Sequence, residues 1–115
     1  MQRGDIHLVN LPTPQNVPGH EQFGTRPALI VQSNRDLPYV NVVMIVPITG
    51  QISADRFPHT IPIRPTQENG LSRESLLLIF QLRALDRKRI SRKIGQIEPG
   101  LMAQVDSELR LLLDL

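Results

Sequence analysis

The sequence has no cysteine and no tryptophan, and its only aromatic residues are three phenylalanines and one tyrosine. Without cysteine the chain forms no disulfide, binds no zinc through thiolates and has no cysteine nucleophile. This composition is typical of a reducing compartment. The aromatic residues are also too few for the base-stacking platform of many single-strand-binding sheets.

Long apolar runs are missing as well, and none approaches the roughly 20 residues that a membrane-spanning helix needs. The N-terminal segment reaches a charge at Asp5 before any apolar run begins. We therefore expect a cytoplasmic protein that does not enter a membrane. At 115 residues we expect one domain, spanning residues 1–115, with a functional site that is shallow or shared between subunits.

Basic residues are concentrated late in the chain, although the formal net charge is only +2. Between residues 83 and 93 a single acid, Asp86, stands among six bases: Arg83, Arg87, Lys88, Arg89, Arg92 and Lys93. A local basic patch attracts a polyanion by releasing condensed counterions, whatever the overall charge. The alternative interpretation is a solvated turn and strand edge without a ligand.

Short apolar segments separated by turn residues predict a mainly β fold. The expected strands are residues 5–11, 28–32, 40–46, 60–64, 76–82 and 90–97. Two of them, 28–32 and 40–46, are continuous and rich in β-branched residues, as expected for strands that are covered on both faces or lie at a barrel core. In residues 60–64, apolar and polar residues alternate, and Pro62 favours an edge strand. Residues 12–25 and 50–58 are expected to be loops.

The last part of the chain changes its period. Leu101, Val105, Leu109 and Leu112 recur at helical spacing, and Pro99 suits a first helical turn. This pattern predicts an amphipathic helix that packs on the sheet. Many short strands followed by one terminal helix indicate a small barrel of the SH3-like kind with a C-terminal α-helix.

Residues 19–27, GHEQFGTRP, bring a carboxylate, a carboxamide and a guanidinium within six positions, at Glu21, Gln22 and Arg26. Two glycines allow a sharply shaped loop that aims these groups at one point. The planar guanidinium of Arg26 suits phosphate oxygens. The alternative is an ion pair between Glu21 and Arg26 that steadies the loop.

A second candidate group lies in the run VPITG at residues 46–50, where Thr49 ends an apolar strand. A threonine held at a strand end presents its hydroxyl with little freedom, which suits donation to an anionic oxygen. Strands also end in this way for structural reasons alone. The acids are scattered, with no HExxH or DxD spacing, so we expect neither a metal nor another cofactor.

Three histidines, His7, His20 and His59, offer a rival acid and base chemistry. His7 lies within a predicted strand, where a packing role is expected. His20 belongs to the loop at residues 12–25. We favour the arrangement of Arg26 and Thr49.

Five segments together resemble the MazF/PemK toxins, ribonucleases of bacterial toxin–antitoxin pairs. The segments are RGDIHLVNL at 3–11, GHEQFGTRPALIV at 19–31, VPIT at 46–49, GLSRESLLLIFQLRALDRKRI at 70–90 and IGQIEPGLMAQVDSEL at 94–109. They follow the order of the family and cover most of the chain. The resemblance implies an SH3-like barrel, a homodimer, and sequence-specific, metal-independent cleavage of single-stranded RNA such as mRNA.

By position, the resemblance implies that Arg26 and Thr49 are catalytic. Glu21 then either accepts the proton of the ribose 2′-hydroxyl or orients Arg26. The implied RNA-binding residues are Gln22, His59, Gln81 and Arg83. Phe80 departs from the family, because many relatives have an acid before the glutamine at this point.

The implied reaction is attack by the 2′-hydroxyl on the adjacent phosphorus, which leaves a 2′,3′-cyclic phosphate and a 5′-hydroxyl. The implied partner is an acidic antitoxin whose disordered tail folds into the RNA groove and blocks it. Two other functions stay open: a noncatalytic relative that binds RNA or antitoxin, and a gyrase inhibitor like the CcdB toxins, which needs neither Arg26 nor Thr49.

Overall fold

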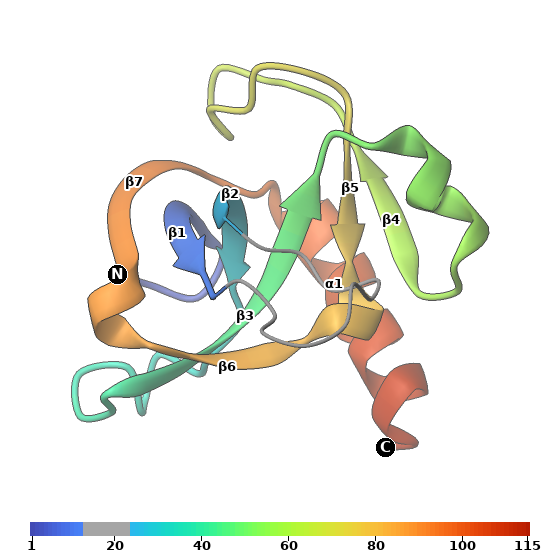
Figure 1. Ribbon diagram of the computed structural model, residues 1–115. Coiled ribbons are helices and arrows are strands. Elements are labelled where there is room, and N and C mark those ends of the chain that lie inside the picture. The colour runs from blue at the N-terminus through green and yellow to red at the C-terminus, as the bar shows by residue number, and fades with distance from the viewer. Residues whose placement is uncertain (13–23) are drawn as a thin grey trace.

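The computed structural model describes residues 1–12 and 24–115. This part of the chain forms seven β-strands, three short 3₁₀ helices and one C-terminal α-helix (Figure 1). The strands are β1 (Asp5–Leu11), β2 (Gly24–Ile30), β3 (Val42–Thr49), β4 (Thr60–Ile63), β5 (Ser75–Leu78), β6 (Arg83–Asp86) and β7 (Ile90–Gln96). The helices are η1 (Ile52–Arg56), η2 (Ile79–Gln81), η3 (Arg87–Arg89) and α1 (Pro99–Leu113).

The strands form an antiparallel sheet in the order β4-β5-β3-β2-β1-β7, and β6 pairs separately with β3. The long strand β3 organises this arrangement, because successive parts of it pair with β6, β2 and β5. The sheet therefore curves around β3, as Figure 1 shows. A mainly β fold with a C-terminal helix is confirmed, and the SH3-like barrel is compatible with it. The edge position predicted for residues 60–64 is also confirmed, because β4 ends the strand order.

Two hydrophobic clusters lie on the two faces of the central strands. Leu29 of β2 belongs to the cluster that α1 covers through the fully buried Val105. Ala28 and Ile30, on the other face of β2, belong to the second cluster. The apolar runs of β2 and β3 are thus covered on both faces, which their β-branched sequences predicted.

Helix α1 begins at Pro99 and ends at Leu113, followed by Asp114 in a left-handed conformation. Arg3, near the N-terminus, fixes this helix to the sheet. Its guanidinium lies 2.7 Å from Asp106 of α1 and also donates to the carbonyl of Val31. Within the described residues, no helix is long and apolar enough to cross a membrane.

Several strand boundaries differ from the prediction: β3 runs from Val42 to Thr49 and not over 40–46, and β6 was not predicted. Strand β2 begins at Gly24, within the predicted loop, because its pairing with β1 continues as far as Leu11. The strand predicted at residues 76–82 ends at Leu78, where the 3₁₀ helix η2 turns the chain toward β6. The residues of this turn are mainly apolar, like those of the strand before it, so the apolar pattern of the sequence did not predict the turn.

Candidate functional site

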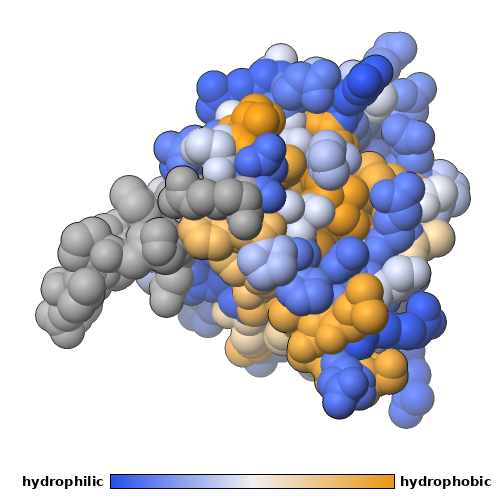
Figure 2. Space-filling model, turned by 90° about the vertical axis from the view of Figure 1, so that its right-hand side faces the viewer, coloured by the Kyte–Doolittle hydropathy of each residue, from blue (hydrophilic) through white to orange (hydrophobic). Residues whose placement is uncertain are grey.

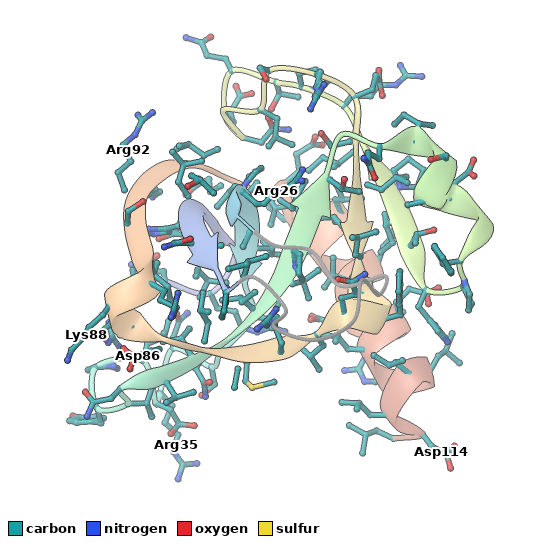
Figure 3. All side chains as sticks on the ribbon, viewed as in Figure 1. Arg26, Arg35, Asp86, Lys88, Arg92 and Asp114 are labelled. Carbon is teal, nitrogen blue, oxygen red and sulfur yellow. The ribbon has the colours of Figure 1, made fainter. Side chains whose placement is uncertain are left out.

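Arg26 and Thr49 lie on neighbouring strand ends. Strand β2 pairs with β3 through Ala28 and Pro47. The paired residues end there, and the same register continued by two residues runs from Arg26 of β2 to Thr49 of β3. Figure 3 shows Arg26 at the end of β2, beside the end of β3. The fold thus sets side by side the strands that carry two residues 23 positions apart in the sequence.

Thr49 is held firmly in place. Its side chain belongs to the last residue of β3, and the residue is only 1% exposed. The hydroxyl oxygen accepts a hydrogen bond of 3.1 Å from the backbone N–H of Gln51. Because a hydroxyl also carries one proton to donate, this bond orients Thr49 without using that proton.

A cleft of about 280 Å³ lies at the same end of the sheet. Among the described residues, those with charge that line it are three arginines, Arg26, Arg73 and Arg92, and none is an acid. Hydroxyl groups are contributed by Thr25, Ser72 and Ser75, while the rest of the lining is apolar residues, glycine and proline. A cleft with several cations and no acid attracts an anionic ligand.

Two of the cleft arginines were not predicted as site residues. Arg92 appeared only as a member of the basic run, and Arg73 lies in a turn segment without any periodic pattern. Arg73 approaches Gly50 so closely that a Cβ atom there would lie 2.3 Å from its Nε. A glycine directly after the candidate catalytic threonine was the only sequence signal for this contact.

Gln81 and Arg83, two predicted RNA-binding residues, lie on either side of the turn after η2. Gln81 is the last residue of η2, and Arg83 begins β6 opposite Ile45 of β3. Both are half-buried, and neither lines the cleft. Their contact with RNA stays a prediction.

His59, another predicted RNA-binding residue, has a positive φ of 58°. Its Nδ1 lies 2.8 Å from Oε2 of Glu108 in α1. This pair connects the segment before β4 to the helix. Close by, the rings of Phe57 and Phe80 pack with centroids 5.2 Å apart. A contact between His59 and RNA stays a prediction, since His59 does not line the cleft.

Three residues of the predicted loop, Glu21, Gln22 and His20, lie outside the described residues. Their predicted roles therefore rest on the sequence. Among the described histidines, His7 is buried in β1, where its Nδ1 lies 2.9 Å from the carbonyl oxygen of Ser91. This confirms the packing role expected for His7. In residues 1–12 and 24–115, no group of three or more histidines and acids could hold a metal ion.

Part of the predicted basic patch has structural partners. The guanidinium of Arg87 donates to the carbonyls of Val40 and Leu37, which fixes the loop before β3. Lys93 lies 3.2 Å from the buried carboxylate of Asp5. These two bases stabilise the fold, whereas Arg92 is exposed and lines the cleft.

Comparison with known proteins places this architecture in a family. Residues 2–113 match the family model described as PemK-like, MazF-like toxin of type II toxin–antitoxin system. Among solved structures, MazF from Deinococcus radiodurans shares 26% sequence identity, with a TM-score of 0.80 over 100% of this chain and 97% of that one.

Two mycobacterial structures have similar folds at lower identity. The Mycobacterium tuberculosis toxin MazF-mt6 is 19% identical, with a TM-score of 0.77 over 96% of this chain and 97% of that chain. An endoribonuclease in complex with its cognate antitoxin, from Mycobacterial species, is 20% identical, with a TM-score of 0.76 over 100% of this chain and 96% of that one.

Proposed function

The chain belongs to the PemK-like, MazF-like family of toxins of type II toxin–antitoxin systems, and on this premise we propose that it is an endoribonuclease that cleaves single-stranded RNA without a metal. The observation that carries the proposal is that β2, which carries Arg26, pairs with β3, which ends at Thr49, and that Arg26 lines a cleft in which none of the described residues is an acid. The substrate supplies the nucleophile, its own ribose 2′-hydroxyl, so the protein needs to align it and stabilise charge.

In the proposed reaction, the 2′-hydroxyl attacks the adjacent phosphorus in line, and the 5′-oxygen of the next nucleotide leaves. The products are a 2′,3′-cyclic phosphate and a 5′-hydroxyl. Arg26 stabilises the negative charge that develops on the phosphorane, since a guanidinium stays protonated and donates to two oxygens at once. Thr49 donates its hydroxyl proton to a non-bridging oxygen.

Glu21 completes the proposed site in one of two roles. As a base, it accepts the proton of the 2′-hydroxyl. As an orienting group, it fixes the guanidinium of Arg26. A Glu21→Gln variant separates these roles, because the amide still accepts a hydrogen bond from Arg26 but is no base. Loss of the rise in cleavage rate with pH in this variant would assign the base role.

The proposed chemistry is tested by mapping product ends. Purified protein is incubated with mixed-sequence RNA in EDTA, and the fragments are analysed by mass spectrometry. We expect 2′,3′-cyclic phosphate and 5′-hydroxyl ends, and no cleavage of the same strand with a 2′-deoxyribose at the cut position. Cleavage of that deoxy-substituted strand, or a strict requirement for a metal, would contradict the proposal.

We also propose an acidic antitoxin as the protein partner. The three arginines of the cleft, which no acid accompanies among the described lining residues, support an acidic ligand. A MazE–MazF structure from Deinococcus radiodurans is 26% identical to this chain over its full length. An antitoxin tail that occupies the cleft would compete with RNA. Equal RNA affinity with and without saturating antitoxin would contradict this competition.

A homodimer is the proposed assembly. Three large apolar residues in the last turn of α1 and just after it are exposed: Leu111, Leu113 and Leu115. Figure 2 shows apolar side chains gathered low on the face that carries α1. Such a patch supports burial against a second copy. Sedimentation of the wild-type protein as a monomer at micromolar concentration would contradict the dimer.

A further inference from the structure

The guanidinium of Arg73 occupies the space that a side chain at position 50 would fill. An added Cβ at Gly50 would lie 2.3 Å from Nε and 2.7 Å from Cζ of Arg73, distances that real Cβ atoms do not show. The backbone of Arg73 is fixed as well, because the hydroxyl of the buried Ser75 donates to its carbonyl at 2.9 Å. The sequence therefore specifies where this guanidinium lies.

Among the described residues, no acid neutralises Arg73. Within residues 1–12 and 24–115, its guanidinium makes no hydrogen bond and no ion pair, and no carboxylate lines the cleft. The adjacent Glu74 is associated with Arg64 instead, at 3.9 Å. Arg73 is exposed and lines the cleft together with Arg26. Its donors are thus available to an anion that enters the cleft.

The position of Arg73 relative to Thr49 suggests which anion it binds. Gly50 follows Thr49 directly, and successive residues at a strand end point to opposite sides. In agreement with this alternation, Ile48 and Gly50 line the cleft, whereas Thr49 does not. Arg73 therefore lies against the residue that follows Thr49, in the cleft that Arg26 also lines.

We propose that Arg73, seated against Gly50, is a second phosphate-binding position, which binds the phosphate next to the cleaved one in the same RNA strand. This inference rests on the proposed ribonuclease function. An RNA strand that crosses the end of β3 presents one phosphate to Arg26 and Thr49 and its neighbour to Arg73. Such a contact holds the substrate and takes no part in the chemical step, so it acts on KM and on salt dependence.

Four variants test the second position: Arg73→Ala, Gly50→Ala, the double variant, and Arg35→Ala as a matched control. Arg35 is an exposed arginine near the lower edge of the molecule in Figure 3, well away from Arg26. Gly50→Ala displaces only the flexible end of Arg73, and its own φ lies outside the left-handed region, so the fold tolerates alanine there. Circular dichroism verifies the fold of each variant.

Binding is measured by fluorescence anisotropy over a range of salt concentrations. The probe is a labelled mixed-sequence RNA with 2′-O-methyl riboses, which lacks the nucleophile and stays intact. For Arg73→Ala we expect a roughly tenfold loss of affinity and a salt slope lower by about 0.7, the value for one phosphate contact to a single strand. On cleavable RNA, KM rises to a similar extent while kcat is largely retained.

Gly50→Ala is expected to reproduce much of the effect of Arg73→Ala, and the double variant to be no worse than Arg73→Ala alone, because both changes remove one contact. Arg35→Ala keeps the wild-type affinity and slope. An unchanged slope in Arg73→Ala, or a loss of kcat at constant KM, overturns the inference. If wild-type protein binds the probe but cuts no RNA, the ribonuclease proposal fails, while the slopes still decide on Arg73 as a phosphate-binding residue.

Discussion

Replacing Thr49 with valine removes one hydroxyl from a buried position and nearly preserves the shape of the side chain. The structural cost is the hydrogen bond from the N–H of Gln51, which contributes about 1 kcal/mol. A domain of this kind is stable by about 5–15 kcal/mol. The unfolded fraction of Thr49→Val therefore stays below about 1%, so loss of fold cannot explain a large loss of activity.

The catalytic cost is larger in our mechanism. One preorganised donor to a developing negative charge contributes about a hundredfold to a thousandfold to the rate, or about 3–4 kcal/mol of activation free energy. We expect Thr49→Val to lose at least a hundredfold in the single-turnover cleavage rate. The assay follows a labelled RNA in EDTA with protein in excess, and urea unfolding of the same preparation measures its stability.

Thr49→Ser is the matched control for this prediction. Serine keeps the hydroxyl and its bond to Gln51 but loses a buried methyl group, so it costs stability without removing the donor. We expect Thr49→Ser to be much faster than Thr49→Val. A Thr49→Val protein that is folded and cleaves at the wild-type rate would refute the role of the hydroxyl, as would a serine variant as slow as the valine one.

Three further predictions concern the scaffold and are checked by denaturant unfolding. Gly70→Ala should lower the free energy of unfolding by more than about 2 kcal/mol, because φ is +71° and a Cβ would lie 2.0 Å from the carbonyl oxygen of Ile94. A decrease of less than about 0.5 kcal/mol would contradict this prediction. Val105→Ala should cost about 2 kcal/mol, since it empties a fully buried site between α1 and the sheet; an unchanged midpoint would contradict that packing. Lys93→Met should lower the free energy of unfolding by about 1–2 kcal/mol, because the buried carboxylate of Asp5 loses the ammonium group beside it. The control Arg35→Ala removes no such ion pair and should leave the free energy of unfolding unchanged.

Most of the fold was predictable, because the signals in the sequence are local. Alternation and continuous β-branched runs located the strands, and the spacing of Leu101, Val105 and Leu109 located α1. The turn at η2 was missed, since residues 79–82 are mainly apolar and a 3₁₀ turn has no periodicity of its own. The early start of β2 was missed because pairing with β1, a nonlocal interaction, extends the strand back to Gly24.

The candidate site was less predictable, because it depends on register. The sequence identified Arg26 and Thr49 singly and through the family resemblance, but only the pairing of β2 with β3 sets the strands that carry them side by side. Arg73 was missed because its position depends on a contact with Gly50 across the fold. The pairing of His59 with Glu108 was hidden for the same reason, since 49 residues separate them.

The central claim, that Arg26 is the chemical centre of a ribonuclease, is tested most directly by one comparison of cleavage rates. Wild type, Arg26→Ala and Arg35→Ala are incubated with the same RNA in EDTA at equal concentrations of folded protein. We predict cleavage to 2′,3′-cyclic phosphate ends by wild type and Arg35→Ala, and a loss of at least a hundredfold in Arg26→Ala. Cleavage by Arg26→Ala at the wild-type rate would contradict the account.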